Sequence, residues 1–407
     1  AGRWGNFPSL LLGFVPSETN WWKSNIKKVD YFKVKTSYGR LGNDLVSPFQ
    51  YLTSYSFGTG VPLGDNRTYV PSLIQAGAPN PNITWEVSNM YNLGIEMGMF
   101  QSKLFFDADL FYGRRSNILV KRNSSVPLFT GIRLPDENFG IVDNYGFESV
   151  LGYRGQVRKF SYEVKGNLNF VRNRIREYDE PAQPVPWQVR TGKPHGALLI
   201  YKSLGIFRDQ AHIDSYAHLP NARPGDIIIE DYDQDGEITA KDKQLIPLTT
   251  TPELTFGLDF KLSYGNWTLT ALLQGHGNAI RNLYNDERSG TAGNYYQFEA
   301  EDRWTVNNPD ATKPRAYQWA EEYWRSTHIT DYNYTNVSYV RLRNAQLAYR
   351  IPKHVAERVW LKEARVFVSA QNPFLIYSGN KIMDPEVSGM GAYPIMKTYS
   401  IGANISF

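Results

Sequence analysis

The feature that most constrains the fold of this chain is the strict alternation of apolar and polar residues over its last nine positions. A period of two places the two sets of side chains on opposite faces of a β-strand, so that one face meets an apolar phase and the other meets water. Soluble proteins seldom leave a wholly apolar strand face uncovered, whereas the closing strand of a bacterial outer-membrane barrel faces lipid outward and a wet lumen inward. We therefore predict an outer-membrane insertion signal formed by Tyr399, Ile401, Ala403, Ile405 and Phe407.

The same alternation recurs upstream, in residues 93–99, 104–112, 160–170 and 256–264. Runs of about ten residues cross a thin bilayer when they are tilted. Short polar turns join some of these runs and long polar stretches separate others, as in a barrel with tight turns at one rim and long loops at the other. We predict an all-β fold, an antiparallel transmembrane β-barrel, with about 12–14 strands in this chain. In the run 338–350 the alternation changes parity, which predicts a bulge near Asn344.

Composition agrees with a membrane barrel and excludes other classes. Aromatic residues make up 14% of the chain, and Tyr and Trp serve as anchors at the membrane interface. No apolar run approaches the roughly 18 residues that a membrane helix needs, and a membrane protein without such helices must be a closed barrel. The chain has no cysteine, which excludes disulfides and thiol ligands, and its net charge of +4 is too dispersed to predict binding of nucleic acid.

Polar residues at the expected inward positions predict a wet channel, although the same residues could form ion pairs between neighbouring strands. They are Asp107, Asp109, Glu163, Lys165, Asp259 and Lys261. The segments 209–246 and 276–336 are predicted to be long extracellular loops.

The loop 209–246 contains the spacing of a calcium-binding loop. The candidate ligands are Asp231, Asp233, Asp235, the main-chain carbonyl of Glu237, and Asp242. Gly236 would permit the sharp turn between them, and Ile238 would hold the loop against the protein body. We expect a structural calcium ion that stiffens the loop; a loop that holds magnesium, or a solvated acidic turn without any ion, is the alternative. No arrangement of residues in the sequence indicates a catalytic site, so we expect no enzymatic activity.

An ordered series of short segments resembles the C-terminal barrel portion of the SusC/RagA-like TonB-dependent outer-membrane transporters of Bacteroidetes. The segments are 32–39 (FKVKTSYG) with 42–43 (GN), 83–86 (ITWE), 144–148 (NYGFE), 223–227 (RPGDI), 231–236 (DYDQDG), 339–347 (YVRLRNAQL), 368–372 (VSAQN), 384–386 (DPE) and the terminal strand. Each segment alone is weakly specific, but their order across essentially the whole chain is specific.

The resemblance implies that residues 1–407 form the C-terminal part of a barrel of about 22 strands. The plug domain and the TonB box would then be absent from this chain, which we expect to be truncated or part of a longer transporter; a self-contained small barrel is the alternative. The implied partners are a SusD-like surface lipoprotein, TonB acting through the missing N-terminal part, outer-membrane lipid, the barrel assembly machinery during insertion, and a glycan or peptide cargo.

The function implied by the resemblance is import of a bulky nutrient, a glycan or a peptide, across the bacterial outer membrane. Two alternatives remain open at this point. A SusC-like barrel could be a structural subunit of a larger outer-membrane machine. The chain could also be a secreted, soluble, calcium-binding β-protein that acts on polysaccharide, in which case the apolar strand faces would pack together in a dry interior.

Overall fold

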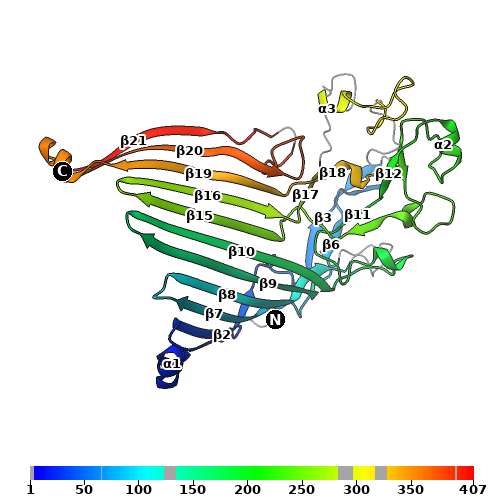
Figure 1. Ribbon diagram of the computed structural model, residues 1–407. Coiled ribbons are helices and arrows are strands. Elements are labelled where there is room, and N and C mark those ends of the chain that lie inside the picture. Colours follow the sequence, from blue (N-terminus) through cyan, green and yellow to red (C-terminus); the bar gives the residue numbers. More distant parts are fainter. Residues whose placement is uncertain (1–3, 66, 123–133, 283–296, 317–327, 390–391) are drawn as a thin grey trace.

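The computed structural model describes residues 4–65, 67–122, 134–282, 297–316, 328–389 and 392–407. Its main feature is one antiparallel sheet of 11 strands, in which each strand pairs with the next long strand along the chain (Figure 1). In these ranges no helix has the length and apolar character needed to cross a membrane. The arrangement is therefore an up-and-down meander that curves as a single wall.

The strands of this sheet are β1 (Ser9–Phe14), β2 (Val29–Asn43), β7 (Glu86–Met99), β8 (Leu104–Lys121), β9 (Asp136–Val157), β10 (Phe160–Glu177), β15 (Leu254–Tyr264), β16 (Trp267–Gly277), β19 (Tyr339–Arg350), β20 (Glu363–Ser378) and β21 (Thr398–Ser406). Most exceed the ten or so residues needed to span a bilayer, and β9 has 22. The expectation of about 12–14 strands is higher than the 11 found in this sheet, because alternating stretches in the long connections form short separate strand pairs instead.

The connections at one end of the sheet are short. Gly265 and Asn266 alone join β15 to β16, and Arg158 and Lys159 alone join β9 to β10. Gly265 has a φ of 58° and Arg158 a φ of 56°, the left-handed conformation that two-residue hairpin turns require. At this end a turn of residues 100–103 joins β7 to β8. The other two connections there contain the short helices η1 (Pro16–Glu18), α1 (Asn20–Asn25), α4 (Lys353–Ala356) and η7 (Glu357–Val359).

The long connections all lie at the other end, as the sequence predicts (Figure 1). They contain the paired short strands β3 (Ser54–Phe57) with β6 (Leu73–Gly77), β4 (Val61–Leu63) with β5 (Thr68–Val70), β11 (Leu198–Ile200) with β14 (Gln244–Ile246), β12 (Ser203–Ile206) with β13 (Ile227–Ile229), and β17 (Ile280–Asn282) with β18 (Tyr334–Asn336). They also contain the helices η3 (Pro186–Gln188), α2 (Gln210–Asp214), η4 (Ala240–Asp242), α3 (Gln297–Ala300) and η6 (Asp331–Asn333).

The apolar strand faces are not packed against each other. Ile401 is 85% exposed and Leu110 is 58% exposed, and both belong to the face that the alternation assigns to lipid. A water-soluble sandwich would bury these side chains between two sheets. The alternative of a soluble β-protein with a dry interior is therefore wrong.

Tyrosines mark the limit of the apolar face near the long connections. Tyr38, Tyr91, Tyr112 and Tyr145 are successive cross-strand partners in β2, β7, β8 and β9. Ten residues of β9 separate Tyr145 from Gly155, which lies opposite Tyr162 near the short turns. At about 3.4 Å per residue and a tilt of about 40°, this length spans roughly 26 Å, the height of the apolar band of an outer-membrane barrel.

The predicted bulge in β19 is confirmed. The pairing of β19 with β20 shifts between Leu342 and Asn344, and its pairing with β16 shifts at the same place. Arg343 is the additional residue, and it resolves the change of parity seen in the sequence.

The longest connections pack into one unit with its own core. Ile206 and Ile227 contact Ala311 and Trp304, so residues from the two predicted loops 209–246 and 276–336 pack on each other. A second cluster contains Tyr201, Leu219 and Ile229, and the partly buried Ile238 packs against it as predicted. A third contains Phe207, Ile213 and Ile228. Parts of the range 276–336, namely 283–296 and 317–327, lie outside the described residues.

Candidate functional site

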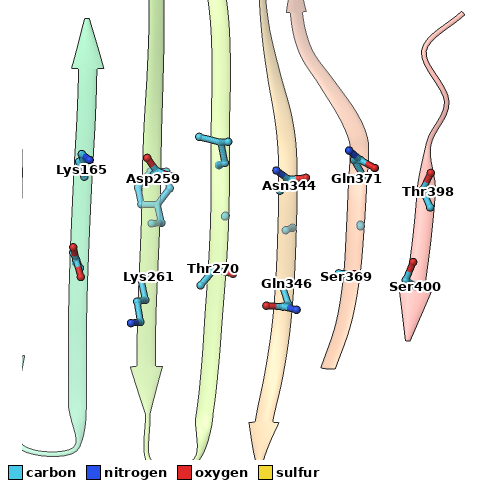
Figure 2. A pocket seen from close by; sticks show the side chains of 16 residues that line it. Lys165, Asp259, Lys261, Thr270, Asn344, Gln346, Ser369, Gln371, Thr398 and Ser400 are labelled. Atoms are coloured by element: carbon cyan, nitrogen blue, oxygen red, sulfur yellow. The ribbon is translucent and has the colours of Figure 1, made fainter. Parts of the chain in front are cut away.

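The inward face of the sheet is polar over its C-terminal half. Figure 2 shows polar side chains from β10, β15, β16, β19, β20 and β21 along this face. They line a hollow of about 890 Å³, a volume that accommodates a small organic ligand. Its polar lining residues are Glu163, Lys165, Asp259, Lys261, Thr270, Asn344, Gln346, Ser369, Gln371, Thr398 and Ser400.

The strand register arranges this lining into two rows of cross-strand neighbours. Glu163 lies opposite Lys261, and Lys165 lies opposite Asp259, so opposite charges are adjacent in both rows. One row continues through Thr270 and Gln346 to Ser369 and Ser400. The other passes the apolar Leu272 and continues through Asn344 and Gln371 to Thr398. All four charged residues belong to the set that the sequence predicts to line a wet channel.

The N-terminal half of the inward face carries ion pairs between strands. Lys35 Nζ lies 3.1 Å from Asp109 Oδ2 and 3.3 Å from Glu96 Oε1. Lys33 Nζ is also 3.3 Å from Glu96 Oε1. Lys35 reaches Asp109 across β7 because Gly94 stands between them; a Cβ atom there would lie 2.4 Å from the Lys35 side chain. Asp109 therefore forms an ion pair between strands, which was the alternative interpretation of the inward charges.

A buried ionic cluster joins β19 to the β20–β21 connection, on the inward face near the long loops. Arg341 Nη2 lies 2.5 Å from Asp384 Oδ2, and Arg343 Nη2 lies 2.5 Å from Glu386 Oε1. Arg341 Nε is 2.7 Å from Glu386 Oε2, and the hydroxyl of Tyr339 donates to Glu386 Oε1 at 2.8 Å. The Arg341 side chain is only 3% exposed. We call these five residues the inner ionic cluster.

The bulge brings Asn344 onto the same inward face as the two arginines of this cluster. In a regular strand Arg341 and Arg343 already share a face, but Asn344 would then point outward; the extra residue returns Asn344 to the inward row. Arg343 Nε also donates to Gln274 Oε1, and its Nη1 donates to Asn372 Oδ1, each at 2.9 Å. The sequence shows segments 339–347 and 384–386 separately, but no local signal indicates that they touch.

The predicted calcium loop has a compact acidic centre. Asp231, Asp233 and Asp235 place one carboxylate oxygen each within 4.8 Å of one another. Asp231 Oδ2 accepts a hydrogen bond from the Gly236 amide at 2.9 Å, whereas Asp231 Oδ1 is buried and has no hydrogen-bond partner. Gly236 has a φ of 87°, which provides the predicted turn. A hard cation would supply the missing partner of Asp231 Oδ1, so this donor set fits calcium.

The other two predicted ligands have different surroundings. Asp242 is fully buried, and its oxygens accept hydrogen bonds from the amides of Tyr232, at 2.8 Å, and Thr239, at 2.7 Å. Its carboxylate therefore closes the loop through main-chain contacts in this structure. Glu237 is exposed and its amide donates to Asp235 Oδ1. Burial and the neighbouring carboxylates of Asp235 and Asp242 raise the pKa of Asp233.

The residues of the predicted insertion signal share one face of β21. Tyr399, Ile401, Ala403 and Ile405 alternate with inward residues such as Ser400, and Phe407 follows the strand. Phe407 is 79% exposed. The placement agrees with a lipid-facing role, and their action as an insertion signal stays a prediction.

An outward apolar band, an aromatic border and a polar concave inner face together define the wall of a transmembrane β-barrel. The family described as "TonB dependent receptor-like, beta-barrel" matches residues 4–372, and the chain belongs to this family. It forms part of a SusC-like barrel of the bacterial outer membrane.

Several known proteins are similar to the chain along its whole length. TonB-dependent receptor P3 of Formosa agariphila is 24% identical over 436 residues, which cover 100% of this chain and 42% of that protein. TonB-dependent receptor SusC of Bacteroides thetaiotaomicron is 24% identical over 423 residues, covering 100% and 40%. A solved structure of the RagAB peptide transporter shares the fold with a TM-score of 0.74, at 19% identity, and the match covers 98% of this chain and 43% of that one. The chain thus spans about two fifths of the length of these relatives.

Proposed function

We propose that this chain forms part of the wall of a channel that imports a bulky nutrient, a glycan or a peptide, across the outer membrane. The observation that carries this proposal is the polar, concave inner face, with its two rows of charged and amide side chains. A wet channel wall needs such groups, because a polar cargo that loses its hydration must find replacement hydrogen bonds. The alternation of positive and negative charge favours cargo with many hydrogen-bonding groups over a cargo of one charge.

We also propose the two partners that SusC-like barrels imply. A SusD-like surface lipoprotein would bind over the packed loop unit and deliver cargo, and TonB would supply energy through a part of the protein beyond this chain. The loop unit supports the first partner, because its three apolar clusters give it a defined shape on the outer side. Within this scheme the chain performs no covalent chemistry.

Narrowing the channel tests the path of the cargo. Ser369 points inward and the adjacent Val368 points outward, so Ser369→Trp and Val368→Trp place the same bulk on opposite faces of β20. In cells that produce the protein at its full length, we expect Ser369→Trp to lower the uptake of a labelled oligosaccharide or oligopeptide pool about tenfold, whereas Val368→Trp leaves it unchanged.

Three controls accompany this measurement. Collapse of the proton gradient should abolish uptake, a surface lipoprotein should co-purify with the receptor, and the cargo should keep its mass after incubation with the purified protein. Equal uptake by both tryptophan variants would refute the path along the inner face. Conversion of the cargo would refute the absence of enzymatic activity.

We further propose that Asp231, Asp233 and Asp235 bind a structural calcium ion, with the main-chain carbonyl of Glu237 as a fourth ligand. The unpartnered Asp231 Oδ1 and the raised pKa of Asp233 support this, because both indicate negative charge that a cation would neutralise. Lys241 Nζ, 3.4 Å from Asp235 Oδ2, partly compensates this charge without a metal. Calcium would stiffen the loop that Ile238 already anchors.

Calcium titration tests the proposal directly. We expect binding heat and a melting temperature that a chelator lowers, and we expect both to disappear in an Asp233→Asn/Asp235→Asn variant. The matched control is Asp214→Asn, which removes an exposed carboxylate from α2 in the same loop unit. Absence of heat in the unaltered protein, or equal loss in the control, would exclude the site.

A further inference from the structure

A group of arginines lies on the outward face, directly beyond the tyrosine row. Arg40, Asn89, Arg114, Asp143 and Arg174 are successive cross-strand partners in β2, β7, β8, β9 and β10. On β2, β7, β8 and β9 each of these residues lies two positions from the tyrosine of its strand. On β10, Arg174 lies two positions from Arg172, the partner of Tyr145. The two rows therefore share the outward face. The direction of the strands places the arginine row on the side of the long connections, where the outer leaflet meets water.

Two further arginines from β10 complete what we call the outer arginine cluster. Arg172 lies opposite Tyr145, within the tyrosine row, and Arg176 lies at the irregularity near the end of β10. The cluster thus consists of Arg40, Arg114, Arg172, Arg174 and Arg176.

Acidic residues only partly neutralise this cluster. Asp143, which is fully buried, lies 2.8 Å from Arg114 Nε and 2.6 Å from Arg176 Nε. Arg172 donates to both oxygens of Glu253 at 2.7 Å. Among the described residues, Arg40 and Arg174 have no carboxylate partner; Arg174 lies over the ring of Tyr145 at 6.0 Å. Even with the nearby Glu177 included, five arginines face three carboxylates, which leaves two positive charges.

The paired arginines also remain accessible. The Arg114 side chain is 47% exposed and that of Arg176 is 45% exposed. The buried carboxylate of Asp143 therefore holds these guanidinium groups in place and leaves part of each fork free to donate outward. Such a preorganised set of forked donors matches the oxygens of a phosphate group better than the point charge of a lysine ammonium would.

The cluster is local, not a general property of this rim. At the corresponding end of β19 and β20 the outward residues are apolar, with Leu342 opposite Phe374 and Val340 opposite Tyr377. Phe374 is 63% exposed and Tyr377 is 54% exposed. A uniform charged rim would serve solubility alone, whereas a cluster confined to β2 and β8–β10 indicates a specific ligand.

An apolar surface continues directly from the cluster into the membrane. Leu110, Phe147 and Phe170 are cross-strand partners in the next row toward the bilayer centre, and the rings of Phe147 and Phe170 lie 6.1 Å apart. A ligand that satisfies both surfaces has an anionic head and hydrocarbon chains. Free phosphate would use only the arginines.

From this geometry we propose that the outer arginine cluster binds the phosphorylated headgroup of a lipid in the outer leaflet, with the acyl chains against the adjacent apolar rows. Basic side chains at the membrane surface attract anionic headgroups, and arginine binds phosphate through paired hydrogen bonds. The inference rests on the membrane location of the barrel and does not depend on the nature of the cargo.

Native mass spectrometry of the detergent-solubilised protein at full length tests this proposal, with bisphosphorylated lipid A and enzymatically dephosphorylated lipid A as probes. The test variant is Arg40→Gln/Arg174→Gln, because neither arginine has a carboxylate partner among the described residues, so the substitution leaves no described carboxylate without its ion pair. The matched control is Arg158→Gln/Arg358→Gln, which removes two exposed arginines at the opposite rim.

We expect the phosphorylated lipid to bind the unaltered protein and the control equally, and the test variant about tenfold more weakly. Millimolar inorganic phosphate should not displace the lipid. Equal binding of both lipids, equal binding by the test and control variants, or displacement by free phosphate would each overturn the proposal. Resistance of the folded protein to denaturation in SDS without heating confirms that every variant is folded.

Discussion

The inner ionic cluster provides the sharpest test of how the wall is held together. The Glu386 carboxylate accepts a hydrogen bond from the Tyr339 hydroxyl at 2.8 Å. It also lies 2.7 Å from Arg341 Nε and 2.5 Å from Arg343 Nη2. Its side chain is 12% exposed and that of Arg341 is 3% exposed. Glu386→Gln keeps the shape of the side chain but leaves two arginines with one carboxylate, Asp384. Removing one partner of a buried ion pair lowers the free energy of unfolding by about 3–5 kcal/mol. Because Asp384 remains as a carboxylate partner, we expect a loss at the lower end, about 3 kcal/mol.

The matched control is Glu363→Gln. Glu363 pairs with Arg350 at 3.2 Å, but the two side chains are 57% and 68% exposed, so the same substitution should cost about 0–1 kcal/mol. Guanidinium unfolding of both variants in detergent micelles measures the difference. If the two losses agree within about 0.5 kcal/mol, the cluster does not carry the stability that we assign to it.

Three further predictions concern the loop unit, the lipid face and the calcium loop. Gly225 has a φ of 88°, and a Cβ atom there would lie 2.7 Å from tryptophan and arginine side chains, so Gly225→Ala should increase proteolysis of the loop unit. Gly192 has a φ of 87° but open space around it, so Gly192→Ala should have the smaller effect of backbone strain alone. Equal proteolysis of the two variants would contradict this account. Ile401→Lys should destabilise the inserted barrel by about 2–4 kcal/mol while the inward Ser400→Lys is tolerated, as the fraction of heat-modifiable folded protein would show. Because the pKa of Asp233 is raised, protons should compete with calcium at a higher pH than for an ordinary aspartate. Titration calorimetry at decreasing pH measures the calcium affinity. A calcium affinity that stays constant until the pH reaches the pKa of an ordinary aspartate would contradict this prediction.

The strands were predictable because their side chains face two different phases. Alternation in residues 160–170 and 256–264 identifies β10 and β15 and assigns Glu163 and Asp259 to the inward face, as the structure confirms. The change of parity in the run 338–350 predicted a bulge near Asn344 for the same reason, and the structure places the additional residue at Arg343. Each of these signals lies within one strand, where the period of two is a local property.

Contacts between distant segments were not predictable from the sequence. The register that aligns Arg40 with Arg114 and Arg174 depends on the stagger of all intervening strands, which no local pattern encodes. Likewise, Asp242 matches the spacing of a calcium ligand, but only the fold shows that its oxygens receive main-chain amides. Spacing identifies the type of atom available and not its partner.

The unequal strand lengths give the outer rim an oblique outline. β9 has 22 residues, twice the 11 of β15 and β16. At about 3.4 Å per residue the longer strand extends roughly 37 Å further along its own direction. The rim is therefore high along β9 and low along β15 and β16, and the compact loop unit connects to the strands on the low side. Under the proposed import function, a large cargo would therefore have its shorter approach to the inner face above β15 and β16, beside the loop unit.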